Sequence, residues 1–248
     1  MTTPHSFYHP SLIHAWAIGA RHVATATNVG FVIAVGCGTD WGASAAELKS
    51  LDAEAGKRSC ERPSSVSEMI LPSVCEGAFE NAAEAIDRGL QFFGRARGRG
   101  LRFSGWTHTY FERLVGQWQD KDGSRHCFRS NKLLDVITKL NLWNRNAESA
   151  CYIHIPMDNE GFRTRGGPCL QYVQFRAHGN HLLDVIGLYR AHDYANKALG
   201  NLVGLDRLGR FVARHIGREL NGISVVSLHP YTDQRGRLLN LANDVAPQ

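Results

Sequence analysis

Apolar and polar residues alternate over a short segment in the third quarter of the chain and predict a β-strand there. Residues 170–176 alternate at the two-residue period of a strand. Gly166, Gly167 and Pro168 come directly before them and are typical of a turn. Cys169 therefore lies where a turn leads into a strand.

Apolar residues also recur at helical spacing through much of the chain. This spacing predicts helices over residues 10–24, 43–55, 79–93, 131–140 and 202–220. Apolar runs predict further strands over residues 31–35 and 151–156. The chain has 248 residues, 43% of them hydrophobic, which is enough for one sizeable core. We therefore expect residues 1–248 to form a single domain.

Composition narrows the class of protein. No apolar run approaches the roughly 18 residues of a membrane span, and residues 1–5 do not begin a secretion signal. We therefore expect a cytoplasmic protein with no membrane partner. The six cysteines show no C-x-x-C spacing, which argues against a zinc site and predicts free thiols and no bound metal.

The formal net charge of +5 indicates an anionic partner, either a nucleotide or a nucleic acid. Much of the excess lies in residues 94–102, where glycine and arginine alternate. This alternation predicts an irregular loop rather than a helix. Its guanidinium groups can grip phosphates, or the segment can be a solvated connection. No aromatic residue is interleaved with the arginines, so nucleic acid is the less favoured partner.

The position of Cys169 suits a nucleophile. A thiol at the edge of a strand can be approached by a ligand, and Arg163, Arg165 and Arg190 can supply a positive field that favours the thiolate. The alternative interpretation is a small buried apolar residue, because free cysteine is among the most buried residue types.

Sequence downstream of Cys169 resembles the thymidylate synthase superfamily. Pro168-Cys169 through Gln174-Phe175 keep the spacing of the family's active-site strand. The arginine, the aspartate three residues later, the asparagine that opens a long helix and the His-x-Tyr of the family have counterparts in Arg190, Asp193, Asn201, His229 and Tyr231. The similarity extends over residues 131–231 and is faint before them.

The resemblance implies an α+β protein of thymidylate synthase-like fold, a large twisted sheet flanked by helices, and a homodimer packed through its sheets. It implies transfer of one carbon, as methyl or hydroxymethyl, to C5 of a pyrimidine nucleotide or nucleoside, with 5,10-methylenetetrahydrofolate as cofactor. Cys169 would add to C6 of the ring, and Tyr110 and Asp193 would complete the catalytic set. The implied substrate-binding residues are Arg190, Asn201, Gln171, His229, Tyr231 and Arg165.

Asn201 is the residue that would choose the base. Its amide can both donate and accept, which suits the O4 and N3–H edge of a uracil-like ring, whereas an aspartate would favour cytosine. His229 and Tyr231 are two apart in an extended segment and can hold a ribose hydroxyl. Each also has a structural alternative: Asn201 can cap the helix that follows it, and His229 and Tyr231 can pack in the core.

The chain departs from the family at several positions. Ala147 and Glu148 stand where the family has two phosphate-binding arginines, so either Arg145 or residues 94–102 compensate, or the substrate is not a simple monophosphate. The family's folate-covering tail has little counterpart after Arg235, and its glutamate-tryptophan element is not recognisable. Two alternatives therefore stay open: a folate-independent hydrolase or lyase of an unusual base or nucleoside, and a non-catalytic protein that binds nucleotide or RNA.

Overall fold

The protein is a mixed α+β structure, with about 51% helix and 23% strand. The computed structural model describes residues 5–26, 30, 32–37, 44–100, 108–128, 130–142, 151–156, 167–179 and 181–247. The mixed class agrees with the sequence prediction. The specific thymidylate synthase fold stays a prediction.

A six-stranded sheet organises the described part of the chain, in the order β1-β2-β9-β7-β6-β5. The pairs β1/β2 and β7/β9 are parallel, and the other neighbouring pairs are antiparallel. The strands are β1 (His5–His9), β2 (Val32–Cys37), β5 (Tyr152–His154), β6 (Leu170–His178), β7 (Leu182–Tyr189) and β9 (Glu219–Ser227). Two short pairs stand apart from this sheet: β3 (Gln117–Gln119) with β4 (Arg125–Cys127), and β8 (His192–Asp193) with β10 (Pro230–Tyr231).

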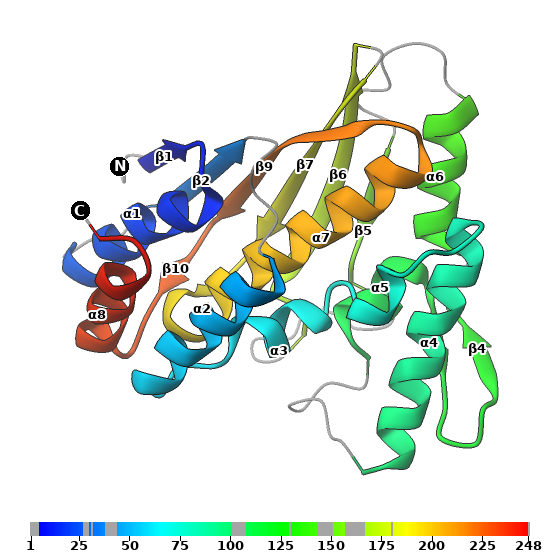
Figure 1. The fold of residues 1–248 in the computed structure, drawn as a ribbon, viewed down its shortest axis with the longest axis horizontal. Helices are drawn as coiled ribbons and strands as arrows, with labels where there is room; N and C mark the ends of the chain where they lie inside the picture. Colours follow the sequence, from blue (N-terminus) through cyan, green and yellow to red (C-terminus); the bar gives the residue numbers. More distant parts are fainter. Residues whose placement is uncertain are drawn as a thin grey trace.

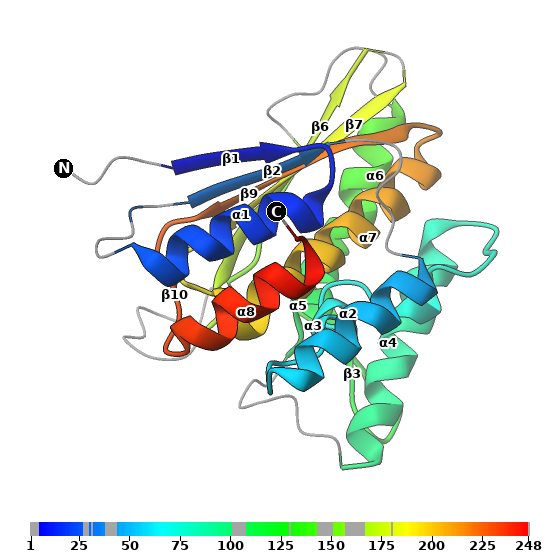
Figure 2. The same cartoon turned by 60° about the vertical axis from the view of Figure 1, so that its left-hand side comes forward.

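Helices cover one face of the sheet. Figures 1 and 2 show α1, α7 and α8 on the same side, and Figure 2 shows no described helix on the other side. The α-helices are α1 (Leu12–Thr25), α2 (Ala45–Lys57), α3 (Pro63–Glu68), α4 (Ala82–Gly98), α5 (Tyr110–Val115), α6 (Lys132–Leu142), α7 (Leu199–His215) and α8 (Arg235–Val245). A 3₁₀ turn η1 (Ser73–Cys75) and a π-helical segment η2 (Tyr194–Ala198) complete the set.

The two faces of β6 explain why its sequence alternates. Val173, Phe175 and Ala177 are buried beneath the helices, whereas Tyr172 and Gln174 on the opposite face are only partly buried. The predicted strand is therefore confirmed, and it continues two residues beyond the predicted end.

α7 packs directly on the centre of the sheet. Almost every residue in its first three turns is buried. Gly187 of β7 makes this approach possible, because a Cβ at that position would lie 2.6 Å from Cδ1 of Leu205. A larger residue at this position would force the helix away from the strand.

The prediction of an irregular loop over residues 94–102 is wrong for residues 94–98, which form the last turns of α4. Gly94 serves close packing rather than flexibility: a Cβ there would lie 3.0 Å from Cγ of Gln119 in β3. Arg97 is held internally, since its Nη2 lies 2.6 Å from Oε2 of the buried Glu112. Tertiary contacts thus override the low helix propensity of glycine.

A charge network joins α7 to the segment before α4. Arg207 of α7 holds both carboxylate oxygens of Glu76, at 2.8 Å and 3.1 Å, and also reaches Glu68 at 3.1 Å. The neighbouring Asp206 is buried and accepts a 3.0 Å hydrogen bond from Nε of Arg210. Burial outweighs this cation and raises the pKa of Asp206 to about 7.

Asp206→Asn should stabilise the protein more at pH 8 than at pH 5. The folded-state pKa of Asp206 lies above the unfolded value of about 3.9, so stability is lost as the pH rises towards 7 and the buried carboxyl ionises. The variant lacks this loss, and its free energy of unfolding relative to the native chain should rise by about 2 to 3 kcal/mol between the two pH values, because the loss accrues from pH 5 to about 7 at about 1.4 kcal/mol per pH unit. Urea unfolding at both pH values measures it. Glu80→Gln, at an exposed position, is the control, and an equal effect of Asp206→Asn at both pH values would contradict the assignment.

Candidate active site around Cys169

Cys169 is half-buried at the start of β6, on a turn that only glycine suits. Gly167 has φ of +79°, in the left-handed region. Pro168 follows it, and the backbone oxygen of Cys169 accepts a 2.9 Å hydrogen bond from the amide of Arg190. The turn is thereby fixed to the end of β7, and Cys169 lies just before the first residue of β6, an inner strand of the sheet. Cys169 also packs against the hydrophobic core, so the alternative interpretation as a small apolar residue stays open.

Tyr110 is brought to Cys169 from 59 residues away. Its hydroxyl accepts hydrogen bonds from the backbone amides of Cys169, at 3.1 Å, and Leu170, at 3.2 Å. Tyr110 is the first residue of α5, where Thr109 and Glu112 form a capping box. Burial raises the pKa of its phenol, and the nearby Cys169 adds to the rise. The placement predicted for Tyr110 thus agrees with the structure, whereas its catalytic role stays a prediction.

The charges around Cys169 do not make it a thiolate at rest. Arg190 and Lys197 lower the pKa of the thiol and Asp193 raises it, but burial is the largest effect and the net shift is upward. Arg190 lies beside the turn, where its Nε donates to the oxygen of Pro168 at 3.2 Å. Arg163 and Arg165, predicted to add positive field, lie outside the described residues. Among the described residues, burial thus outweighs the two cations that favour the thiolate.

Asp193 holds the start of the π-helical segment. Oδ1 accepts from the amides of Ala195 and Asn196, at 3.1 Å and 3.2 Å, and Oδ2 accepts from Nδ2 of Asn196 at 2.9 Å. Both oxygens are used in this cap. Asp193 is close enough to influence the pKa of both Cys169 and Tyr231, and its main local contacts are structural.

Asn201 is buried inside α7 and is not a helix cap. The predicted helix start at residue 202 is wrong, because η2 runs directly into α7 at Leu199. The amide nitrogen Nδ2 of Asn201 lies 3.1 Å from Nε2 of His192, whose Nδ1 lies 2.8 Å from Oγ of Ser227. Burial lowers the pKa of His192 to about 3, so this histidine is neutral. Asn201 is therefore held by a buried chain of polar groups.

Gln171, His229 and Tyr231 surround the same end of the sheet. Gln171 donates through Nε2 to the oxygen of Pro168. β10 pairs with β8 so that Tyr231 lies opposite Asp193. The His229 and Tyr231 rings are stacked with centroids 5.7 Å apart, which agrees with the expectation that they point the same way. His229 is exposed and Tyr231 is 36% exposed, so neither packs in the core.

Several predicted residues cannot be placed. Arg165, the segment with Arg145, Ala147 and Glu148, and residues 101–102 of the arginine segment lie outside the described residues. Within the described part of the arginine segment, Arg97 donates a hydrogen bond to Glu112. Neither Arg95, Arg97 nor Arg99 is among the charges that shift the pKa of Cys169.

Three groups near Cys169 were not found from the sequence: His192, Lys197 and Tyr189. The Tyr189 ring stacks on His192 with centroids 4.0 Å apart. Its buried hydroxyl has no hydrogen-bond partner among the described residues. Tyr189 occupies a buried strand position and His192 a two-residue strand, so their spacing carries no signal that separates them from ordinary core residues.

The described residues contain no group of three or more His, Cys, Asp or Glu side chains placed to hold a metal ion. Nor is any helix in this part of the chain long and apolar enough to cross a membrane. Five cysteines, including Cys169, are free thiols. No family model matches the chain, and no curated protein matches it significantly.

Proposed function

We propose that this protein is a C5 one-carbon transferase of the thymidylate synthase type, which methylates or hydroxymethylates a pyrimidine nucleotide or nucleoside through a covalent adduct of Cys169. The supporting observation is the convergence of residues that are far apart in the sequence. Tyr110 contacts the backbone of Cys169, and Arg190 contacts the turn before it. Tyr231 and Asp193, paired across β10 and β8, lie within electrostatic range of the thiol.

The proposed chemistry begins with the sulfur of Cys169. Pyrimidine C5 is a poor nucleophile until a thiolate adds to C6, which makes C5 an enamine-like carbon able to attack a one-carbon electrophile. Loss of the C5 proton then allows the thiolate to leave. Arg190 and Lys197 favour the thiolate over the thiol, whereas burial favours the thiol.

The C-terminal helix α8 bears on whether the protein binds a folate cofactor. The resemblance implies 5,10-methylenetetrahydrofolate, which the family covers with its C-terminal tail. Here residues Arg235–Val245 form α8, whose Leu238, Leu241 and Ala242 are buried, and α8 packs against α1, α2 and η2. A segment fixed in this way does not fit the covering role. The residues of α8 are therefore not assigned to a folate site.

A non-catalytic nucleotide-binding protein is the second candidate, because the pKa of Cys169 is raised rather than lowered. A protonated thiol can line a binding site without reacting. The same site would still read a pyrimidine ring and a ribose. The two candidates differ in whether a bond between sulfur and C6 forms.

The open face of the sheet supports a homodimer. No described helix covers the side of the sheet that carries Tyr172, Leu188 and Val226 (Figure 2). Leu188 pairs with Tyr172 on one side and with Val226 on the other, so the three form a row across β6, β7 and β9. We propose that a second copy of the chain packs on this face.

Exchange of the C5 hydrogen tests the proposal without any cofactor. Addition of the thiolate to C6 lets C5 take up deuterium from D₂O, and reversal of the addition releases the original hydrogen. We expect the C5–H proton signal of a uracil ligand to disappear in the presence of the protein. A panel of deoxyuridylate, uridylate, uridine and cytidine also shows which sugar and phosphate are accepted. Binding of these ligands without exchange would favour the non-catalytic candidate.

Asn201→Asp should change the preference from a uracil-like to a cytosine-like ring. The amide can accept from N3–H and donate to O4 of uracil, whereas a carboxylate has no proton to donate to O4 but can accept from the N4 amino group of cytosine. The expected change in relative affinity is about 1 to 3 kcal/mol. Because Asn201 is only 4% exposed inside α7, the variant should also lose about 1 to 3 kcal/mol of stability. Titration with uridine and cytidine ligands and thermal melting measure both.

The matched control for Asn201→Asp is Asn240→Asp, which makes the same chemical change at an exposed position of α8. The control variant should alter neither the preference for uracil over cytosine nor the thermal stability. If Asn201→Asp destabilises the chain but leaves the preference unchanged, Asn201 serves only the contact with His192 and does not face the base.

A further inference from the structure

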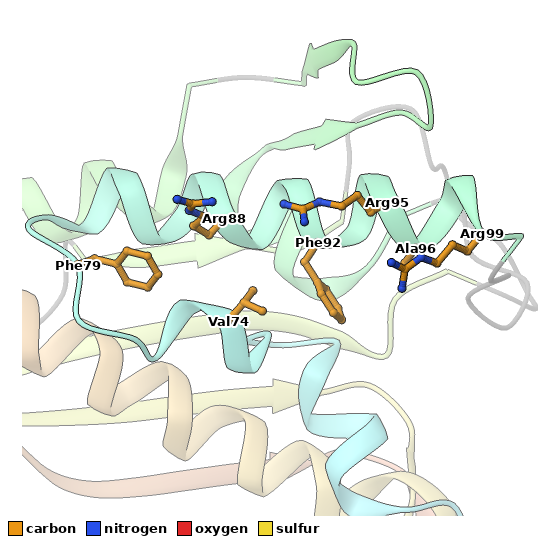
Figure 3. A pocket seen from close by; sticks show the side chains of 7 residues that line it. All are labelled: Val74, Phe79, Arg88, Phe92, Arg95, Ala96 and Arg99. Carbon is orange, nitrogen blue, oxygen red and sulfur yellow. The ribbon is translucent and has the colours of Figure 1, made fainter.

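A pocket of about 380 Å³ lies between α4 and η1, and none of its lining residues takes part in the site around Cys169. Figure 3 shows Phe79, Phe92 and Val74 bordering the space between the two elements, with arginine side chains along α4. The volume lies in the range of small-molecule pockets, which begins at about 300 Å³. The pocket is therefore large enough for a ring-sized ligand.

One face of α4 supplies most of the lining. Arg88, Phe92, Arg95 and Arg99 line the pocket and are spaced four, seven and eleven residues from the first of them. At about 100° per residue, this spacing places all four on one stripe of the helix. All four are exposed. Arg95 and Arg99 come from the segment 94–102, for which the sequence predicted either a phosphate-gripping loop or a solvated connection.

The apolar part of the pocket is open to solvent. Phe92 is 36% exposed and Val74 is 39% exposed, and the ring of Phe79 is directed towards the same space (Figure 3). Aromatic rings exposed beside cations favour a flat ring as ligand, because stacking and contact with guanidinium groups act together.

The positive charge of the pocket is not neutralised by the described residues. None of the described lining side chains is acidic. Among the described residues, Arg88 and Arg99 form no hydrogen bond or ion pair. Within the same residues, Arg95 donates only to Oε1 of Gln91, at 3.1 Å. The nearby Asp87 is already held by Arg125 and Gln91. Arg95 and Arg99 also repel each other at i, i+4, and a bound anion would relieve this repulsion.

We propose that this pocket binds a small aromatic phosphate, with the ring against Phe79 and Phe92 and the phosphate held by Arg95 and Arg99. A dianionic phosphate presents several acceptor oxygens, which suits a group of guanidinium donors better than the two oxygens of a carboxylate. The site is independent of the reaction proposed for Cys169 and would be occupied whether or not that reaction takes place.

Calorimetric titration of the full chain with phenyl phosphate tests the proposal, with inorganic phosphate, benzoate and benzyl alcohol as partial probes. We expect phenyl phosphate to bind at least about tenfold more tightly than each of the other three, because only it offers both the ring and the dianion. The affinity for phenyl phosphate should fall by about tenfold in each of three variants: Arg95→Gln, Arg99→Gln and Phe92→Ala.

Two control variants separate this pocket from other cationic surfaces. Arg235→Gln removes the same charge from an exposed position of α8 and should leave the affinity unchanged. Arg190→Gln alters the Cys169 site and should also leave it unchanged. The three pocket variants and Arg235→Gln should keep the native melting temperature within a few degrees, because the substituted side chains are exposed.

Three results would overturn the proposal. Inorganic phosphate could bind as tightly as phenyl phosphate, which would leave the aromatic part without a role. The control Arg235→Gln could weaken binding as much as Arg95→Gln, which would indicate general charge attraction. Arg190→Gln could abolish binding that Arg95→Gln retains, which would place the ligand beside Cys169. None of these results bears on C5 exchange, so the proposed function stands or falls separately.

Discussion

Cys169→Ser should abolish exchange of the C5 hydrogen of a uracil ligand with deuterium, while the protein stays folded and still binds the ligand. The step needs an anionic nucleophile at C6, and a serine hydroxyl does not ionise near neutral pH as a thiol can. Sulfur and oxygen differ little in size, and Cys169 is only half-buried, so the substitution removes reactivity with little effect on packing. Proton NMR of the ligand in D₂O follows the loss of the C5–H signal.

The pH dependence of exchange gives the same prediction a second measurement. Because burial raises the pKa of Cys169, the thiolate fraction of the free protein grows as the pH rises through neutrality and beyond. The native exchange rate should therefore increase with pH in the range from 7 to 9, the region of an ordinary thiol pKa of about 8.5. Cys127→Ser, at the exposed free cysteine of β4, should behave like the native chain. Near-normal exchange by Cys169→Ser would exclude the covalent mechanism.

Leu188→Asp should convert a dimer into a monomer. Leu188 lies in the middle of the row formed with Tyr172 and Val226 on the open face of the sheet. A carboxylate placed in such an interface would be desolvated opposite its own symmetry copy, which costs several kcal/mol. That cost is enough to shift a micromolar dimer to a monomer, because each 1.4 kcal/mol is a factor of about ten in the dissociation constant.

Light scattering coupled to size exclusion distinguishes the two states at micromolar concentration. Asn240→Asp places the same charge on α8, on the helical side of the sheet, and should remain dimeric. The melting curve of Leu188→Asp shows whether the monomer is folded, which is expected because the substituted side chain lies on the face away from the core. A native chain that is already monomeric at these concentrations would contradict the proposed assembly.

Local patterns in the sequence were enough to predict the elements whose periodicity reflects one-sided burial. The helix predicted over residues 10–24 is α1, and the one predicted over 131–140 is α6, each displaced by no more than two residues. The alternation after Cys169 gives β6 because one face of that strand packs on helices and the other is open. In such elements, the order of apolar and polar residues along the sequence already shows which face is buried.

The errors arise where a distant contact decides the local structure. Residues 94–98 look like a loop because glycine lowers helix propensity, but β3 packs so closely on α4 that Gly94 is required there. Asn201 looks like a cap, but Asp193 caps the π-helical segment that precedes α7. The chain of His192 and Ser227 behind Asn201 joins β8 to β9, and no periodicity of the sequence records such a pairing.

The resemblance predicts one site that contains Cys169, Arg190 and Asp193, and its roles for these residues stay predictions. Arg190 and Asp193 lie close enough to Cys169 to shift the pKa of its thiol. The raised pKa of Cys169 was not predictable, because it depends on how much surrounding protein excludes water from the sulfur. Desolvation is a property of the packed fold and not of any pair of residues.

The two hydrogen bonds at the Tyr110 hydroxyl limit what this residue can do to a substrate. A phenolic oxygen has two lone pairs, and here the amides of Cys169 and Leu170 use both. The neutral phenol is therefore not a base, and taking up a proton from C5 requires the phenolate, which has a third lone pair. Burial raises the pKa of Tyr110 and disfavours this phenolate, whereas the two amides stabilise its charge. Because the same amides belong to Cys169 and Leu170, the ionisation of Tyr110 and the position of the nucleophile's backbone depend on the same two hydrogen bonds.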